Sequence, residues 1–215
     1  MVGDWLVRGG AAVVLRVKDF WVAAVRQRRY VEGVALRNEF EGSLVRLRAV
    51  EPEDADVWYA SGLDTELDRR GGFTQLPSSR SAYRERAVEA SKAPEDDSVS
   101  LMIETLDGVV VGGLSVGANR RTRVFDYGIG VGREHWRKGY GTEALQVLFR
   151  FYFLELGYQK VETGVYAFNE PSLRFHENFG FAVEGRRRRA VFTRGEYHDV
   201  VLFGMTCEEF TARHG

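Results

Sequence analysis

A segment rich in glycine and basic residues carries the clearest chemical signal in the sequence. It reads Trp136-Arg137-Lys138-Gly139-Tyr140-Gly141-Thr142-Glu143-Ala144 and lies between an expected strand and an expected apolar helix. Glycine can adopt backbone angles closed to other residues, so Gly139 and Gly141 allow successive N–H groups to converge at the helix N-terminus. The helix dipole and the cationic side chains of Arg137 and Lys138 favour an anion there. The segment therefore predicts a phosphate-binding turn.

Two other phosphate-binding motifs fit this segment less well. A nucleotide P-loop would end in Gly-Lys followed by Ser or Thr, and the segment lacks that ending. A dinucleotide-binding turn would lie early in the chain, with a ribose-binding acid about 20 residues later. Here Gly139-Tyr140-Gly141 lies late and is followed by Ala144. The remaining alternative is an ordinary strand-to-helix turn with incidental glycines.

A second segment, further along the chain, has the pattern of a capped helix. It begins with Asn169-Glu170-Pro171-Ser172 and ends with Asn178-Phe179-Gly180-Phe181. Asn169 is a suitable N-cap, Pro171 lies in the first turn where its missing N–H does no harm, and Gly180 is a suitable terminator. These roles are structural, and they do not exclude a role in binding.

With these two segments the sequence resembles the GNAT acetyltransferase superfamily over residues 43–205. In that family a strand, a short glycine-containing loop and a helix hold the pyrophosphate of coenzyme A. The family loop often reads Gln/Arg-x-x-Gly-x-Gly/Ala, which this sequence matches at Gly139 and Gly141, with Trp136 in the first place. The amino-acid sequence of residues 135–144 is also similar to that of the RimJ/RimL type, the ribosomal-protein N-terminal acetyltransferases.

The resemblance implies an α/β (α+β) protein with the GNAT acyl-CoA N-acyltransferase fold, which has a mixed, mostly antiparallel twisted sheet with helices on both faces. It also implies that acetyl-CoA is the cofactor and that a primary amine attacks the thioester directly. The cofactor-binding residues that it assigns are Ile129, Val131, Arg137, Lys138, Gly139, Tyr140, Gly141, Thr142, Asn169 and Ser172. Strand N–H groups near residues 129–131 would hold the thioester carbonyl, and Asn169 and Ser172 would contact the pantetheine.

Acetyl transfer to an amine involves two proton movements. The amine must lose a proton to have a free lone pair, and the departing thiolate can be protonated as it leaves. The resemblance indicates Asp126 as the base, since many relatives have a Glu on the equivalent strand; the alternative is an ordinary surface carboxylate. It indicates His176 as the acid, at the position where many relatives have a Tyr. The alternatives are a solvent-facing helix histidine and a thiolate stabilised by backbone N–H groups alone.

The sequence indicates the amine acceptor less clearly than it indicates acetyl-CoA, the acetyl donor. The hairpin over residues 184–199 is again similar to the RimJ/RimL type, whose acceptors are protein N-termini. We expect a peptide or small-molecule amine as substrate. One alternative is an antibiotic or polyamine acetyltransferase with an acidic pocket made by Asp64, Glu66 and Asp68. Another is a coenzyme A-binding module without catalysis.

Consecutive arginines at Arg186–Arg189 could form a nucleic-acid or ribosome-binding patch. Because successive side chains of a strand point to opposite faces, no more than half of them would line one surface, and we favour a solvated strand. The chain has 30 Lys and Arg against 31 Asp and Glu, a formal net charge of -1. A chain with such a charge balance lacks the positive electrostatic field of a general nucleic-acid binder. We therefore expect no nucleic-acid partner.

The elements that position these residues follow from hydrophobic periodicity and turn residues. The sequence predicts strands over residues 44–48, 99–103, 109–114, 124–131, 160–166, 181–191 and 197–205. It predicts helices starting near residue 52 and over residues 81–92, 142–156 and 169–178, with a loop or broken helix over residues 64–77. This order gives a mixed sheet with helices on both faces.

Length and composition suit one domain with an appendage, since 44% of the 215 residues are hydrophobic. We expect residues 42–215 to form the acetyltransferase domain. Residues 1–41 form an extension of unknown role that could add a strand, cap the acceptor groove or mediate a homodimer. The single cysteine, Cys207, excludes an internal disulfide, and the histidine spacing predicts no metal site. We read no export signal and no apolar run of about 20 residues, so we expect a cytoplasmic protein without membrane contact.

Overall fold

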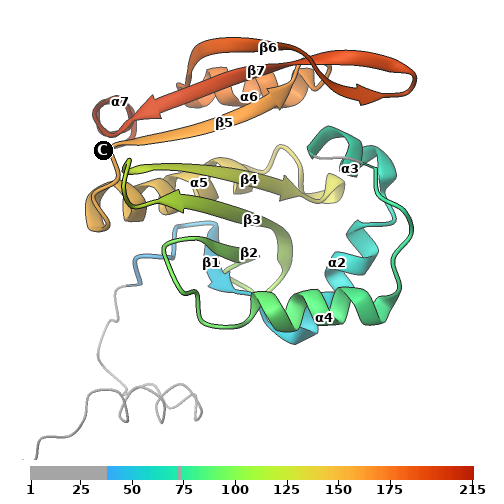
Figure 1. Cartoon of the computed structure of the whole chain (residues 1–215). Helices are drawn as coiled ribbons and strands as arrows, with labels where there is room; N and C mark the ends of the chain where they lie inside the picture. The colour runs from blue at the N-terminus through green and yellow to red at the C-terminus, as the bar shows by residue number, and fades with distance from the viewer. Residues whose placement is uncertain (1–37, 72–73) are drawn as a thin grey trace, which may run out of the picture. The chain divides into compact units, whose positions relative to one another are not determined.

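A seven-stranded sheet organises the computed structural model, which describes residues 38–71 and 74–215 (Figure 1). The strand order is β1-β2-β3-β4-β5-β7-β6. The strands are β1 (Val45–Ala49), β2 (Val99–Thr105), β3 (Val110–Asn119), β4 (Val124–Val131), β5 (Lys160–Tyr166), β6 (Ala182–Thr193) and β7 (Glu196–Thr206). β4 and β5 run parallel, and the other neighbouring strands are antiparallel. The predicted α/β fold with a mixed, mostly antiparallel sheet is confirmed.

Helices cover both faces of this sheet, as predicted. α5 (Tyr140–Arg150), α6 (Glu170–Phe179) and α7 (Cys207–His214) contribute to the large core on one face. α2 (Ala55–Ser61) and α4 (Arg80–Ala90) contribute to a smaller core around Met102 on the other face. α3 (Thr65–Gly71) lies near the end of β4 (Figure 1).

Aromatic side chains fill the large core and fix α5 against the sheet. The ring of Phe149 on α5 lies 5.6 Å from that of Phe125 on β4 and 5.7 Å from that of Phe179 on α6. Phe149 and Phe125 are almost completely buried, and burying such a side chain contributes about 1.5–3 kcal/mol. The turn that precedes α5 is thereby attached to a rigid helix.

Several boundaries differ from those that the sequence predicted. α5 begins at Tyr140, before the predicted start at residue 142, and its regular part ends at Arg150. The chain continues as a π-helical turn over Phe151–Glu155, in which Leu156 N donates to the Phe151 carbonyl at 3.1 Å. α3 lies inside the segment over residues 64–77 that was predicted as a loop or broken helix.

The C-terminal helix α7 was not predicted, although the sequence contains its start signal. The hydroxyl of Thr206 accepts a hydrogen bond from Glu209 N at 3.2 Å, and the Glu209 carboxylate accepts one from Thr206 N at 2.8 Å. This reciprocal pair is a capping box, which requires Thr followed three residues later by Glu. Phe210 then packs α7 against the ring of Phe153 at 5.4 Å.

The predicted extension over residues 1–41 lies outside the described residues except for residues 38–41. Within that described part, Phe40 packs on Phe151 with 4.6 Å between ring centroids, and its carbonyl accepts a hydrogen bond from Leu47 N at 2.8 Å. In the described part of the chain, no helix combines the length and apolar character needed to cross a bilayer.

Candidate active site

The predicted phosphate-binding turn connects the end of β4 to α5. Gly139 is the N-cap of α5 and has φ +85°, and Arg137 also has a positive φ of 61°. Within the described part of the chain, the N–H groups of residues 137–142 donate to no protein acceptor, as expected at a helix N-terminus. The side chains of Arg137 and Lys138 are exposed and make no ion pair with other described residues. The turn therefore presents free N–H groups and positive charge to solvent.

The two glycines of this turn have different roles. Gly139 needs its left-handed conformation, which a side chain would disfavour. Gly141 has an ordinary helical backbone, and an added Cβ would meet Val131 Cγ2 at 3.7 Å, which is normal van der Waals contact. The expectation that both glycines supply unusual backbone angles is therefore correct for Gly139 and wrong for Gly141. Arg137 supplies the second left-handed residue.

Glu143 fixes the first turn of α5 to the start of β1. Its carboxylate accepts hydrogen bonds from Ser43 N at 2.8 Å, Ser43 Oγ at 2.6 Å, Leu44 N at 2.6 Å and Val45 N at 2.8 Å. Burial alone would raise the pKa of Glu143, but these hydrogen bonds outweigh it and hold the pKa below its usual range. A Cβ on Gly42 would lie 2.5 Å from Glu143 Cδ, so the approach requires glycine there. No sequence pattern predicted this role of Glu143.

β4 and β5 separate after a short parallel pairing. The last paired residues are Asp126 and Glu162. Beyond them, Thr163 Oγ1 donates to the Tyr127 carbonyl at 3.3 Å. Among the residues that the structure describes, the backbone of residues 128–131 of β4 then has no partner strand on the side that faces β5. We call this unpaired backbone the β4–β5 opening.

The register of β4 shows which N–H groups face the β4–β5 opening. Gly132 N donates to the Val111 carbonyl of β3 at 2.9 Å. Because antiparallel positions alternate between bonded and non-bonded pairs, the N–H groups of Ile129 and Val131 point away from β3 and towards the opening. The Val131 carbonyl fits this alternation, since it accepts a hydrogen bond from Trp136 Nε1 at 2.7 Å. Ile129 and Val131 were predicted from the sequence to hold the thioester carbonyl, and their N–H groups are not used in the pairing of β4 with β3.

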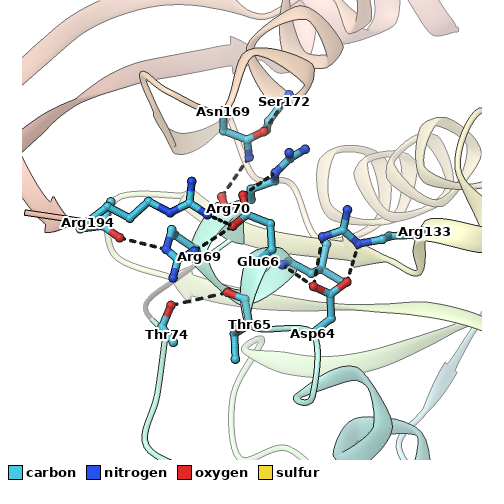
Figure 2. Close-up of polar contacts among 12 residues, drawn as sticks. Asp64, Thr65, Glu66, Arg69, Arg70, Thr74, Arg133, Asn169, Ser172 and Arg194 are labelled. Atoms are coloured by element: carbon cyan, nitrogen blue, oxygen red, sulfur yellow. Dashed lines mark hydrogen bonds and ion pairs between the residues drawn. The ribbon is translucent and has the colours of Figure 1, made fainter. Parts of the chain in front are cut away.

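The start of α6 is hydrogen-bonded to α3. Asn169 is the N-cap of α6, and its side-chain oxygen accepts a hydrogen bond from Ser172 N at 3.4 Å. Its side-chain amide donates to the Arg70 carbonyl at 2.9 Å (Figure 2). The predicted N-cap role is confirmed. The structure adds that the Asn169 amide holds the end of α3.

Two ion pairs attach α3 to other parts of the site (Figure 2). Asp64, just before α3, accepts hydrogen bonds from Arg133, which follows β4, with 3.0 Å between Nη2 and Oδ1. Glu66 on α3 pairs with Arg194 in the β6–β7 turn at 2.6 Å. Because these partners are far apart in the sequence, local patterns could not reveal that α3 closes one side of the site.

His176 lies in the aromatic core. Its side chain is 3% exposed, and its ring lies 5.3 Å from that of Phe203 and 5.2 Å from that of Phe181. Nδ1 donates to the Ser172 carbonyl at 2.7 Å, and Nε2 has no partner among the described residues. Burial lowers the pKa of His176 below its usual range. The alternative of a solvent-facing histidine is wrong. The role of proton donor stays a prediction, and it is one that burial disfavours.

Asp126 lies at the start of the β4–β5 opening. It is exposed, on the face of the sheet opposite to its buried neighbours Phe125 and Tyr127. An added Cβ on Gly117 of β3 would lie 2.9 Å from Asp126 Oδ2, so a glycine there gives the carboxylate room. A carboxylate in this position can exchange protons with water. Its role as the base stays a prediction.

Comparison with known protein families identifies the fold and the chemistry together. The family described as Acetyltransferase (GNAT) domain matches residues 45–182, which is more than half of the chain. The chain belongs to the GNAT acetyltransferase family. Its relatives and structural neighbours are also acetyltransferases.

Two relatives come from Bacillus subtilis (strain 168). The chain is 38% identical over 182 residues to the SPbeta prophage-derived uncharacterized N-acetyltransferase YokL, covering 81% of this chain and 96% of YokL. It is 27% identical over 172 residues to YdaF, which is provisionally named a ribosomal N-acetyltransferase, covering 77% of this chain and 93% of YdaF.

A solved structure supports the fold. It is spermidine N-acetyltransferase from Vibrio cholerae in complex with CoA and spermine, which matches with a TM-score of 0.70 and 19% identity, covering 79% of this chain and 99% of that one. This likeness shows the fold alone. It adds to the family match without specifying an acceptor.

GNAT acetyltransferases use acetyl-CoA, and the described residues of this chain fit such a ligand. The free N–H groups of residues 137–142 and the cations of Arg137 and Lys138 suit a diphosphate. The N–H groups that face the β4–β5 opening suit a chain of amide groups, because an extended ligand can bond there as an added strand would. In residues 38–71 and 74–215, no group of acidic, histidine or cysteine side chains could hold a metal ion.

Proposed function

We propose that the chain transfers the acetyl group of acetyl-CoA to a primary amine, on a protein N-terminus or on a small molecule. The observation that supports this proposal is that two groups of free backbone N–H donors lie close together in the chain. The phosphate-binding turn at residues 137–142 follows β4 after a short 3-10 helix over Arg133–His135, and the free N–H groups of Ile129 and Val131 lie near the end of that strand. One extended ligand with a diphosphate and amide groups would satisfy both groups of donors.

In this proposal the backbone N–H groups of β4 bind and polarise the thioester. Acetyl-CoA supplies an activated acetyl group, and the free N–H groups of Ile129 and Val131 would hold its carbonyl oxygen as negative charge develops there. The N–H groups are fixed by the pairing of β4 with β3. They need no rearrangement when the charge forms.

The amine must reach this carbonyl without its extra proton. We propose that Asp126, acting through water, accepts that proton as nitrogen attacks the carbonyl carbon. The carbon–nitrogen bond forms, the carbon–sulfur bond breaks, and the thiolate leaves beside the backbone donors. The exposure of Asp126 next to the β4–β5 opening supports a relay through water.

Sequence similarity offers a first candidate for the acceptor class. The likeness to the RimJ/RimL type, and the 27% identity to YdaF, favour a protein N-terminus. A polyamine is the main alternative within the same chemistry, and a coenzyme A-binding module without catalysis is the alternative outside it.

The test is release of free thiol from acetyl-CoA by the full chain, with peptides, amino acids and polyamines as acceptors. Release that depends on an added amine, with the acetylated amine detected by mass spectrometry, is the expected result. Binding of acetyl-CoA without transfer to any amine would support the non-catalytic module and contradict the proposal. The variant Asp126→Asn should lower turnover while leaving acetyl-CoA affinity unchanged.

A further inference from the structure

A small pocket is lined by residues of α2, α3 and α4, the helices that follow β1 in the chain (Figure 1). Its volume is about 230 Å³. Its lining includes Trp58 of α2, Asp68 of α3, and Tyr83 and Arg86 of α4. We call it the α2–α4 pocket. It brings together a carboxylate, two aromatic rings and a guanidinium group.

Asp68 differs from the two other acids that were considered from the sequence. Asp64 pairs with Arg133, and Glu66 pairs with Arg194 and Arg69. The carboxylate of Asp68 makes no hydrogen bond or ion pair with any residue in the described ranges. Burial, and next the charge of Asp64, raise the pKa of Asp68 above its usual range. A partly buried carboxylate without a counter-ion would gain from a cationic ligand.

One ring in the α2–α4 pocket suits the same ligand charge. Trp58 can attract an ammonium group through its ring face, whereas the ring of Tyr83 already lies near the guanidinium group of Arg86. Tyr83 is closely packed at its phenol end, since a Cβ on Gly62 would lie 2.1 Å from Tyr83 Oη. That contact positions Tyr83 and leaves no room for a side chain at residue 62.

Arg86 gives the α2–α4 pocket a second, opposite charge. Its guanidinium carbon lies 5.3 Å from the centroid of the Tyr83 ring. In the described part of the chain, Arg86 pairs with no carboxylate, and Asp68 does not reach it. The pocket thus has an unpaired anion and an unpaired cation. A ligand with an ammonium group and a carboxylate would satisfy both.

The charges around the α2–α4 pocket disfavour a ligand with several ammonium groups. Near α3, the guanidinium groups outnumber the carboxylates of Asp64, Glu66 and Asp68. The arginines are Arg69, Arg70, Arg86, Arg133 and Arg194. A polyamine would meet one unpaired carboxylate and several like charges. A single ammonium next to a carboxylate meets complementary groups.

The helix α3 links the α2–α4 pocket to the proposed acetyl-CoA site. Asp68 lies four residues after Asp64, which immediately precedes α3, and the two carboxylates are close enough for the charge of Asp64 to raise the pKa of Asp68. Asp64 pairs with Arg133, which precedes the phosphate-binding turn, and the Arg70 carbonyl accepts from Asn169. These contacts hold α3, and Asp68 with it, beside the donor-binding residues.

We propose that the α2–α4 pocket is the acceptor site and that it takes an amine bearing a neighbouring carboxylate, an α-amino acid being the simplest. Asp68 holds the ammonium group and Arg86 holds the carboxylate. This inference rests on the proposed function. It narrows the acceptor class to small zwitterions and argues against the protein N-terminus that the likeness to YdaF favours, because the amine of a peptide N-terminus has an amide in place of the neighbouring carboxylate.

The test compares three acceptors that differ in charge: leucine, leucinamide and spermidine. For the wild-type chain, we expect kcat/KM for leucine to exceed that for leucinamide by about tenfold or more, the effect of one charge-assisted contact. Spermidine should be the weakest acceptor. Arg86→Gln should lower kcat/KM for leucine to the level of leucinamide, and Asp68→Asn should lower it for both.

The matched control is Arg84→Gln, an exposed arginine on α4 with no polar partner in the described ranges, which should keep the wild-type preference. Acetyl-CoA affinity, measured by calorimetry, should be the same in all variants and shows that each is folded. If amines are acetylated but spermidine is preferred, or Arg86→Gln leaves the preference unchanged, the acceptor inference is wrong and the proposed function stands. If the wild-type chain binds no acetyl-CoA, the proposed function itself fails.

Discussion

Replacing Glu143 with glutamine perturbs the phosphate-binding turn without touching the ligand. Glutamine keeps one side-chain oxygen but turns an NH2 group towards donors on Ser43, Leu44 or Val45, so about half of the hydrogen bonds to residue 143 are lost. The remaining hydrogen bonds lose their charge. Hydrogen bonds to charged groups contribute about 1.5–3 kcal/mol each and neutral ones about 0.5–1.5 kcal/mol. Two lost and two weakened hydrogen bonds would together account for about 5–9 kcal/mol. Three of the four are exposed to solvent, which reduces their contribution, so we expect Glu143→Gln to lower the free energy of unfolding by about 2–4 kcal/mol.

The assay is urea-induced unfolding of both chains, with acetyl-CoA titrated into each by calorimetry. Acetyl-CoA should bind Glu143→Gln more weakly, because the start of α5 is no longer held against β1. The control is Glu177→Gln, an exposed residue of α6 without a side-chain partner among the described residues, which should change neither quantity. If Glu143→Gln matches Glu177→Gln in both measurements, the reasoning about this carboxylate is wrong.

The pH dependence of the same variant gives an independent check. The pKa of Glu143 is lower in the folded chain than its usual value of 4.5, so the unfolded chain binds more protons as the pH falls through this range. The stability from Glu143 is fully present above about pH 4.5 and is lost as the pH falls through the lowered pKa. The stability difference between wild type and Glu143→Gln should therefore shrink in acid.

Further predictions concern His176 and the capping of α7. The folded chain disfavours protonated His176, so wild-type unfolding free energy should fall below about pH 6.5 as the unfolded chain takes up the proton. His176→Phe should remove this component and keep acetyl-transfer activity, measured by thiol release; loss of activity at full stability would instead support the acid role. Thr206→Ala should lower the unfolding free energy by about 1 kcal/mol, measured in urea, because it removes the capping box of α7. An unchanged value would contradict that role.

Much of the fold was predictable because its signals are local. Asn169 and Gly180 mark the ends of α6 by residue type alone, and the structure places them at its N-cap and C-cap. The strand over residues 124–131 was predicted with the bounds that β4 has. Local turn chemistry and side-chain alternation are sufficient for such elements.

The hydrogen bonds and packing contacts that hold the site in place were not predictable, because they join residues that are far apart in the sequence. Glu143 bonds to residues 98 to 100 positions away in the chain, and no periodicity indicates such a pairing. The burial of His176 depends on Phe203 of β7, so its position on α6 alone could not reveal it. The capping box at Thr206 and Glu209, in contrast, is a local signal, since Thr is followed three residues later by Glu.

Binding of the acetyl-CoA diphosphate by the turn at residues 137–142 is tested most directly by calorimetric titration of three chains. Gly139→Val strains a residue with φ +85° inside the turn, and Gly108→Val strains one with φ +91° in the β2–β3 turn. We expect Gly108→Val to bind acetyl-CoA like the wild-type chain and Gly139→Val to bind it about tenfold more weakly or worse. A β-branched side chain on a left-handed residue costs about 1–2 kcal/mol, and about 1.4 kcal/mol corresponds to a factor of ten. Equal affinities for all three chains would contradict binding of the diphosphate by this turn.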